Sequence, residues 1–305
     1  MSVAEAAAIG ARLFQFTGAS VLGGSTLFFL YAVTPRADFR WPKLLVGFGA
    51  VGGALGTLCW LMAQAAQVGE QSGDAFDLVK VWSLAAETGF GRIALARLGL
   101  FLVALALNFG HSTRPRWVVL ASLGAVISAT FAWTGHGARD EGAAGLLHLA
   151  ADVVHLLSAA IWIGALAALS LIAWQARLGM AEAGRAVAIG LTRFSAIGLT
   201  VVALLVASGL TNSWFLVGAD GFGGLLSDTY GQVLVVKLLL FGVMLALAAA
   251  NRFIHTPRIE SALASGADRN AFRAVATTVL VETALALAVL GLVSWLGTLA
   301  PSIES

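Results

Sequence analysis

The chain alternates between long apolar runs and short segments that carry most of its charged residues. Eight of these runs are about 20 residues long, the length that a helix needs to cross a lipid bilayer. We predict that each run is a transmembrane helix. The runs cover residues 11–33, 44–66, 88–109, 117–135, 146–174, 190–217, 231–250 and 275–299.

Composition supports a membrane protein and excludes several other classes. Only 11% of the 305 residues are charged, against about 25% in a soluble protein. The formal net charge of +2 is too small to indicate a nucleic-acid partner, and the single cysteine rules out an internal disulfide or a CxxC site. We therefore predict an all-α polytopic protein: a single membrane domain over residues 1–305, with about eight helices in one bundle within the lipid bilayer.

The distribution of basic residues between the connections predicts the orientation of the bundle. The connections between spans one and two, three and four, five and six, and seven and eight hold twelve Lys and Arg residues, whereas the alternate connections hold three. Because cytoplasmic connections carry the excess of positive charge, the first set is expected inside and both termini outside.

The fifth run contains a polar stripe that is unusual for a transmembrane helix. His148, Asp152 and His155 are spaced so that they share one face of a helix, and Trp162 continues this face two turns later. Ionisable groups are costly within hydrocarbon, so this face is expected to point into the bundle and to form a functional site. On the predicted topology, the stripe descends from the outer surface into the membrane.

A third histidine precedes the stripe and suggests a metal site. His136 lies between two glycines at the outer end of the fourth run, twelve residues before His148. Three imidazoles and the Asp152 carboxylate are suitable ligands for copper or zinc. Asp152 is either a ligand or a hydrogen-bond acceptor that orients an imidazole. A network that packs helices together, a proton relay and haem ligation remain as alternatives for this stripe.

Sulfur ligands offer a weaker second candidate. Cys59 and Met62 are three residues apart near the outer end of the second run. Soft sulfur ligands favour Cu(I), although lone Cys and Met residues usually serve as apolar packing groups.

Four further polar residues lie inside predicted spans and need partners there. They are candidates either for transport or for packing between helices. They are Arg97 in the third span, Asn212 near the outer end of the sixth, Lys237 in the seventh and Glu282 in the eighth.

The order of these motifs resembles the copper-resistance D (CopD) family of bacterial inner-membrane proteins. The resemblance covers roughly residues 90–300 and is strongest over 145–255. The segments that carry it are Gly135-His136, His148 to Asp152 and His155, Ala160 to Leu166, Arg193-Phe194-Ser195, Ser208 to Asn212, Thr229 to Lys237, Asn251-Arg252 and Glu282.

The resemblance implies a copper-handling protein of the bacterial inner membrane, often one that works with a periplasmic copper-binding protein. Our interpretation is a transporter of Cu(II) or Cu(I), with zinc as a substitute, that takes copper up from the periplasm and is not an enzyme. His136, His148, Asp152 and His155 form its expected site. The alternatives are a haem-binding membrane oxidoreductase and an assembly factor that holds copper without moving it. The first span departs from several family members, since Gln15-Phe16 stand where those members have a histidine.

Overall fold

A computed structural model describes residues 2–32, 41–69, 72–135, 142–221, 225–265 and 269–300, and the regular secondary structure within these ranges is entirely helical. Eight helical segments are long and apolar enough to cross a membrane, which confirms the predicted number of spans. The first span consists of α1 (Val3–Ser20), η1 (Val21–Ser25) and α2 (Thr26–Tyr31), the second of α3 (Trp41–Val68), the third of α5 (Gly89–Asn108), and the fourth of α6 (Arg114–Thr130) and η3 (Ala132–Thr134). The fifth span is α7 (Gly142–Arg177) and the sixth is α8 (Ala181–Gly221). The seventh consists of α9 (Thr229–Ala250), η6 (Asn251–His255) and α10 (Thr256–Ser265), and the eighth is α11 (Arg269–Leu296).

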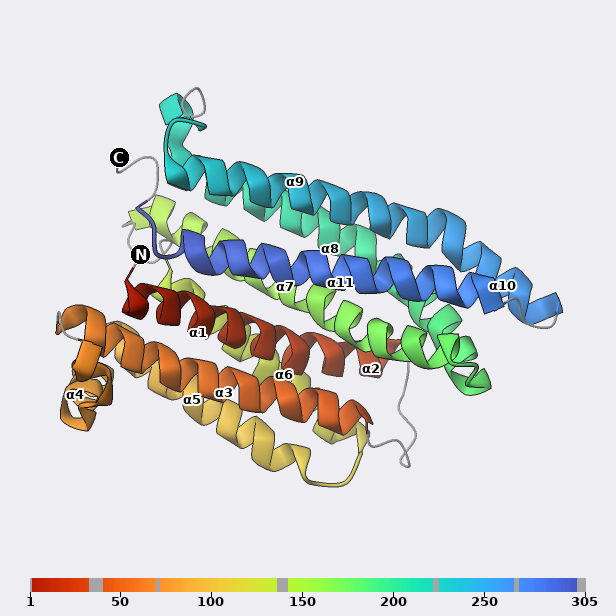
Figure 1. Ribbon diagram of the computed structural model, residues 1–305, viewed down its shortest axis with the longest axis horizontal. Helices are drawn as coiled ribbons and strands as arrows, with labels where there is room; N and C mark the ends of the chain where they lie inside the picture. Colours follow the sequence, from red (N-terminus) through yellow and green to blue (C-terminus); the bar gives the residue numbers. More distant parts are fainter. Residues whose placement is uncertain are drawn as a thin grey trace.

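The helices run roughly side by side in one bundle, with both chain ends at the same end of it (Figure 1). We call this the terminal end, and the opposite end, where α10 lies, the distal end. Several helices continue beyond the predicted apolar runs, notably α7 and α8. Their extensions are rich in Ala and also contain Arg177, Glu182 and Arg185, residue types that favour helix even outside hydrocarbon. At the terminal end, η2 (Ser72–Phe76) and α4 (Leu78–Glu87) connect α3 to α5.

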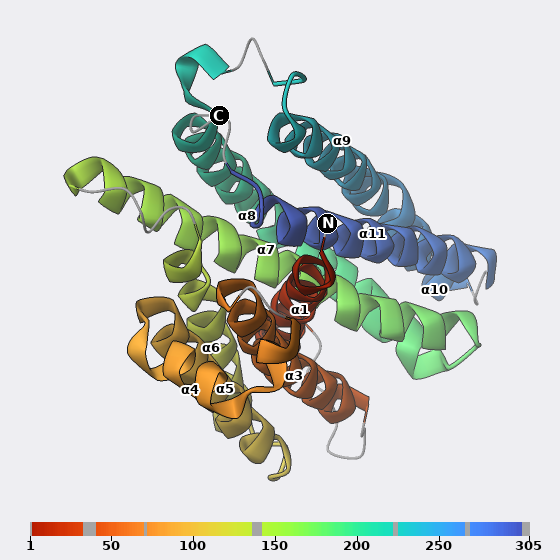
Figure 2. The ribbon, with the colours of Figure 1, turned by 60° about the vertical axis from the view of Figure 1, so that its left-hand side comes forward.

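The first span lies at the centre of the bundle (Figure 2). It contacts α3, α6 and α7 through glycines, so that the backbones approach closely. Gly18 meets Gly53 of α3, and Gly23 meets Gly124 of α6. Gly24 meets Gly164 of α7, where the Ser25 hydroxyl also donates to the Gly164 carbonyl at 2.8 Å. The first span thereby fixes the position of α7, which carries the polar stripe.

Substitution of Gly164 by alanine is expected to loosen this crossing. An added Cβ would overlap with the Gly24 backbone and with the Ser20 carbonyl oxygen. Overpacking of this kind costs about 1–3 kcal/mol in the free energy of unfolding. The measurement is the midpoint of thermal unfolding in detergent. Gly242→Ala is the matched control because nothing lies within 4 Å of its Cβ position. Equal midpoints for the two variants would contradict this close packing.

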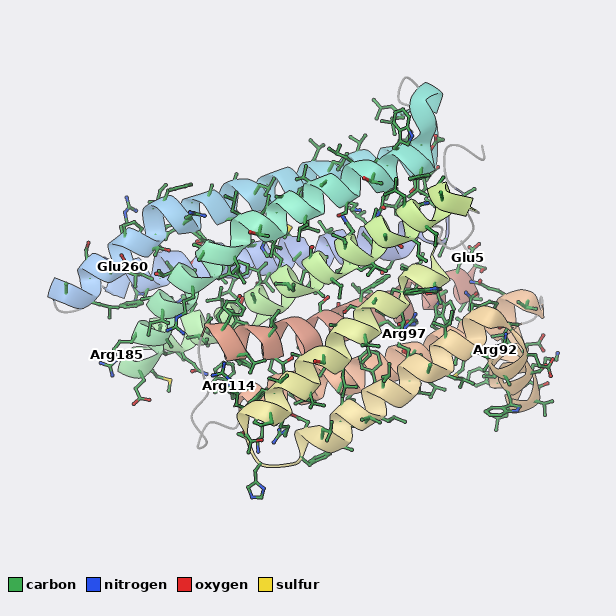
Figure 3. All side chains as sticks on the ribbon, turned by 180° about the vertical axis from the view of Figure 1, so that it is seen from behind. Glu5, Arg92, Arg97, Arg114, Arg185 and Glu260 are labelled. Carbon is green, nitrogen blue, oxygen red and sulfur yellow. The ribbon has the colours of Figure 1, made fainter. Side chains whose placement is uncertain are left out.

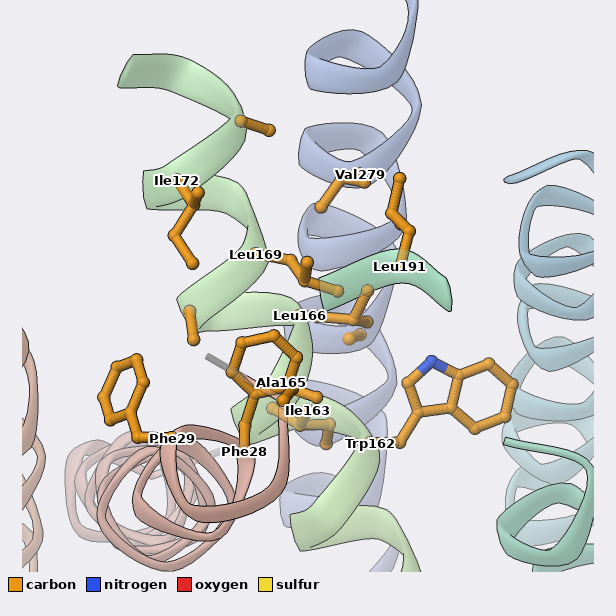
Figure 4. Packing of buried hydrophobic residues seen from close by; sticks show 14 of the residues in the cluster. Phe28, Phe29, Trp162, Ile163, Ala165, Leu166, Leu169, Ile172, Leu191 and Val279 are labelled. Carbon is orange, nitrogen blue, oxygen red and sulfur yellow. The ribbon is translucent and has the colours of Figure 1, made fainter. Parts of the chain in front are cut away.

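Apolar side chains of α7 form the main core at the distal half of the bundle. Leu166, Leu169 and Ile172 are buried between the first span on one side and α8 and α11 on the other (Figure 4). Trp162 points to the side of α7 opposite Phe28, toward Phe241 of α9. The helix thus has its apolar contacts at the distal half and its polar stripe at the terminal half.

Candidate functional site

The polar stripe of α7 lines an internal cavity of about 150 Å³ near the terminal end of the bundle. We call it the histidine cavity. His148, Asp152 and His155 all face it, as the sequence predicted. Its walls come from five of the eight spans besides α7. They include Arg12, Phe16, Phe131, Gly135, Gly209, Asn212, Ser213, Tyr230, Leu234, Lys237, Val293 and Gly297.

Both imidazoles are held by residues of α8. The His148 ring is 2% exposed and stacks on Phe215, with 4.6 Å between the ring centroids and 5° between the planes. His155 Nδ1 lies 3.1 Å from the Ser208 hydroxyl oxygen, and this hydroxyl lies 2.5 Å from the Leu204 carbonyl oxygen. A hydroxyl has one proton to donate. If that proton goes to Leu204, Ser208 accepts from Nδ1–H of His155, which leaves Nε2 with a free lone pair.

Asp152 lies between the two histidines and is bonded to an amide. Asn212 Nδ2 donates to Asp152 Oδ1 at 3.4 Å. A Cβ on Gly135 would lie 3.5 Å from the other carboxylate oxygen, so the end of the fourth span passes close to Asp152. His136 follows Gly135 directly and lies outside the described residues.

Among the described residues, two basic side chains share the cavity with the Asp152 carboxylate. Arg12 and Lys237 both interact electrostatically with Asp152. Arg12 also donates to the Gly297 carbonyl at 3.4 Å, but its Nε is buried without a hydrogen-bond acceptor among the described residues. Asn212 Oδ1 is likewise buried without a donor in this part of the chain. Buried polar atoms without partners are rare in proteins, so these two indicate that a polar occupant belongs in the cavity.

A second, more polar cavity adjoins the histidine cavity at the terminal end. This vestibule has a volume of about 560 Å³, and its lining includes Glu5, Gln64 and Gln67. Arg12 and Gly297 line both cavities, so their contact forms the partition between them.

The described residues do not complete a three-ligand metal site. Within the described ranges, no group of three His, Cys, Asp or Glu side chains is placed to hold a metal ion. Cys59 is exposed and Met62 packs against the small apolar cluster around Trp60, so neither lines the histidine cavity.

Arg97 supports one wall of the histidine cavity from behind. It is 1% exposed and lies within the bundle (Figure 3). Its guanidinium donates to Gln15 Oε1 at 2.8 Å, to the hydroxyl and carbonyl oxygens of Thr130 at 2.9 and 3.1 Å, and to the Thr134 hydroxyl at 3.2 Å. The same group lies 3.9 Å from the centroid of the Phe131 ring, whose side chain lines the cavity.

Trp162 and Glu282 belong to a different place in the bundle. Trp162 Nε1 donates to Glu282 Oε1 at 2.9 Å, and both residues line a separate cavity toward the distal end. The predicted stripe of α7 thus divides between two cavities, with His148, Asp152 and His155 in one and Trp162 in the other.

Sequence reasoning missed three residues that shape the histidine cavity. Arg12 is a lone basic residue within the first apolar segment. Because a charged side chain is energetically costly within a membrane, its presence there could have indicated a functional role. Ser208 and Phe215 gave no such signal, since serines and aromatic residues are common in membrane helices. Their roles depend on how α8 is rotated against α7.

Together the fold and this cavity define a polytopic membrane protein with imidazole, carboxylate and basic groups in a cavity between its helices. Comparison with known proteins identifies the family. The family model described as "Copper resistance protein D-like, N-terminal domain" matches residues 3–146, and the model described as "Copper resistance protein D" matches residues 188–296. The chain belongs to the copper resistance protein D family, which confirms the resemblance found in the sequence.

Three relatives indicate what is known of similar chains. Copper resistance protein D of Pseudomonas syringae pv. tomato is 33% identical, over 97% of this chain and 97% of the relative. Inner membrane protein YebZ of Escherichia coli (strain K12) is 30% identical, over 83% of this chain and 82% of the relative. Copper transport protein CutJ of Bacillus subtilis (strain 168) is 29% identical, over 78% of this chain and 44% of the relative. No solved structure matches the chain.

Proposed function

We propose that this protein moves copper across the bacterial inner membrane and that copper enters through the histidine cavity. The observation that supports this most strongly is the placement of two imidazoles and a carboxylate of one helix around a cavity that a polar vestibule adjoins. The names of the relatives, which include a copper resistance protein and a copper transport protein, agree with this cargo. The chain is a multi-pass inner-membrane protein of the same family.

The distribution of basic residues supports uptake from the periplasm. The predicted cytoplasmic connections, which include Arg177, Arg193 and Arg258, lie at the distal end, whereas the vestibule opens at the terminal end. By the positive-inside rule, the terminal end faces the periplasm. Copper from the periplasm, or from a periplasmic copper-binding protein, would then pass Arg12 to reach His148.

The two histidines mark successive depths along this route. They are seven residues apart on α7, which corresponds to about 10 Å along the helix axis. His148, with His136 as its expected companion, provides the shallower ligands, and His155 provides the deeper one. Imidazole nitrogens bind Cu(II) or Zn(II) and also accept Cu(I).

Asp152 is better suited to orient an imidazole and to balance positive charge than to bind the metal itself. It is the only carboxylate among the described residues that line the cavity, and it faces both Arg12 and Lys237. One carboxylate offsets part of the positive charge of these two groups and so reduces the repulsion that a further cation meets near the imidazoles. Its bond from Asn212 also fixes its position between α7 and α8.

The direct test of transport is the flux of copper into proteoliposomes. Purified protein reconstituted into vesicles should accumulate copper faster than vesicles without protein. Binding without flux would favour an assembly factor that holds copper. A visible spectrum with a Soret band in the same preparation would favour the haem alternative.

Replacement of Asp152 by asparagine is expected to weaken copper binding by about 10–100-fold, the usual effect of losing a group that orients a metal ligand. Asparagine keeps the shape but removes the negative charge that offsets Arg12 and Lys237. The affinity is measured by competition with a copper chelator. Asp77→Asn is the control, because Asp77 caps α4 at the terminal end and asparagine caps equally well. An unchanged affinity in Asp152→Asn would mean that Asp152 serves helix packing alone.

Copper loading is expected to fall as the pH on the terminal side falls. An imidazole must be neutral to bind a metal, so protons compete with copper for the ligand nitrogens. In proteoliposomes of known orientation, loading should decrease when the buffer at the terminal side is acidified from about pH 7.5 to about 5.5, because the more acidic buffer supplies more protons to compete for these nitrogens. The same change at the distal side should leave loading unaltered. Loading that follows only the distal pH would contradict the position of the ligands.

A further inference from the structure

A third cavity, separate from the histidine cavity and the vestibule, lies toward the distal end of the bundle, between α7, α8, α9 and α11. It has a volume of about 230 Å³, and we call it the Glu282 cavity. Its walls are almost entirely apolar and include Leu166, Leu169 and Val279, which Figure 4 shows beside Trp162. Glu282 of α11 lines this cavity and is only 2% exposed. Ionisable residues are rare within membrane spans and are usually functional there, so a carboxyl group in these apolar surroundings indicates a functional role.

The Glu282 carboxyl group is held by neutral donors from two other helical elements. Trp162 Nε1 donates to Oε1 at 2.9 Å, and Asn251 Nδ2 donates to Oε2 at 3.0 Å. Asn251 is itself oriented, since the Thr278 hydroxyl donates to its side-chain oxygen at 2.7 Å. Asn251 begins η6, a π-helical turn between α9 and α10, and such turns are frequent at functional sites.

No cationic side chain of the described residues forms an ion pair with Glu282. Arg252 lines the same cavity, but its guanidinium donates to the Ser195 carbonyl at 3.0 Å. Arg193 donates to the Tyr31 carbonyl at 3.0 Å. The other charged or titratable side chains of the described residues on the neighbouring elements lie outside the lining of this cavity, and they include Arg12, His148, Asp152, His155, Arg177, Glu182, Arg185, Tyr230, Lys237, His255, Arg258, Glu260 and Arg273.

We propose that Glu282 is a proton-binding site and that its occupancy controls the movement of copper from the histidine cavity, an inference that rests on the proposed function. The site suits a proton better than a metal ion. Among the described residues, its polar lining offers one carboxyl group and few further ligands, whereas metal ions require several. A proton needs only one oxygen. Two N–H donors support the anion, and protonation to form an O–H group removes the cost of a bare charge in this apolar site.

Helix α7 connects the two sites physically. Trp162 lies seven residues after His155, about 10 Å further along the helix axis. When Glu282 takes up a proton, the carboxyl group becomes a weaker acceptor for Trp162 Nε1–H. The contact between α7 and α11 at this point therefore changes with protonation, while the same helix carries His148 and His155 in the histidine cavity.

The test separates proton binding from coupling. Infrared difference spectra of the copper-free protein, recorded as the pH is varied, should contain a signal of a buried carboxylic acid that is absent in Glu282→Gln. Glutamine keeps a hydrogen-bonding side chain of the same length but cannot titrate. Glu260→Gln is the matched control, because Glu260 is an exposed glutamate at the distal end and its loss should leave the signal intact. Absence of a Glu282-dependent signal would overturn proton binding, whether or not the protein transports copper.

Coupling between protonation of Glu282 and copper transport is measured as the flux of copper into proteoliposomes. Glu282→Gln should load copper in the histidine cavity as the parent does, but its flux should fall by roughly 5- to 150-fold, the usual range of coupling between two sites. The flux should also lose its dependence on pH at the distal side, and Glu282→Asp should retain that dependence. Parental flux and pH dependence in a copper-loading Glu282→Gln variant would overturn the coupling. If the parent protein itself does not load copper, the proposed function is refuted, whereas the infrared result on proton binding still stands.

Discussion

Replacement of His148 or His155 by alanine is expected to abolish stoichiometric binding of copper to the purified protein. Each imidazole lines the histidine cavity, and each is oriented by a residue of α8, through stacking on Phe215 for His148 and through Ser208 for His155. Alanine removes the ligand nitrogen and leaves the surrounding helices in place. The measurement is the copper content per protein chain, determined by elemental analysis after loading and desalting.

His111→Ala and His255→Ala serve as controls for this experiment. Neither residue lines the histidine cavity: His111 is exposed between α5 and α6, and His255 lies in η6 toward the distal end. Both variants should retain the copper content of the parent. A His148→Ala protein with the parent's copper content would remove the central ligand from the proposed site.

Loss of the Arg97 side chain is expected to cause the largest destabilisation among the substitutions considered. Arg97→Ala would leave Gln15 and the hydroxyl groups of Thr130 and Thr134 without their donor inside the bundle, and would remove the cation from the Phe131 ring. Each buried polar group that is left without a partner costs about 1–3 kcal/mol in the free energy of unfolding. The expected result is a clearly lower midpoint of thermal unfolding in detergent.

Two further variants show whether the network rather than the charge is responsible. Arg97→Lys keeps the charge but not the planar fork that reaches several acceptors, so it should recover only part of the stability. Arg92→Ala, which removes an exposed arginine of the same helix, should leave the midpoint nearly unchanged (Figure 3). A midpoint for Arg97→Ala as high as that of Arg92→Ala would contradict the structural role of Arg97.

The number of spans and the polar stripe were predictable from the sequence because both are local properties. Hydrocarbon thickness sets the length of an apolar run, and helix periodicity places His148, Asp152 and His155 on one face. Both predictions needed only residues adjacent in the chain. The helical ends beyond the apolar runs were not predicted, since hydropathy does not report helix in polar segments.

The partners of the stripe depend on contacts between helices that are far apart in sequence. Periodicity did not indicate that Ser208 faces His155 or that Arg12 faces Asp152. It also placed Trp162 on the face of His155, whereas the structure assigns the two residues to different cavities. The reason is that neighbouring helices cross α7 at an angle, so one face of α7 meets different partners at different depths.

X-ray absorption at the copper edge is the most direct measurement of the central claim, that imidazoles of the histidine cavity hold the copper. Protein loaded with one equivalent of copper should show nitrogen or oxygen ligands at about 2.0 Å with the scattering pattern of imidazole rings. That imidazole contribution should shrink in His148→Ala and in His155→Ala. A shell of sulfur ligands at about 2.3 Å, or an imidazole contribution that both variants leave unchanged, would contradict the claim.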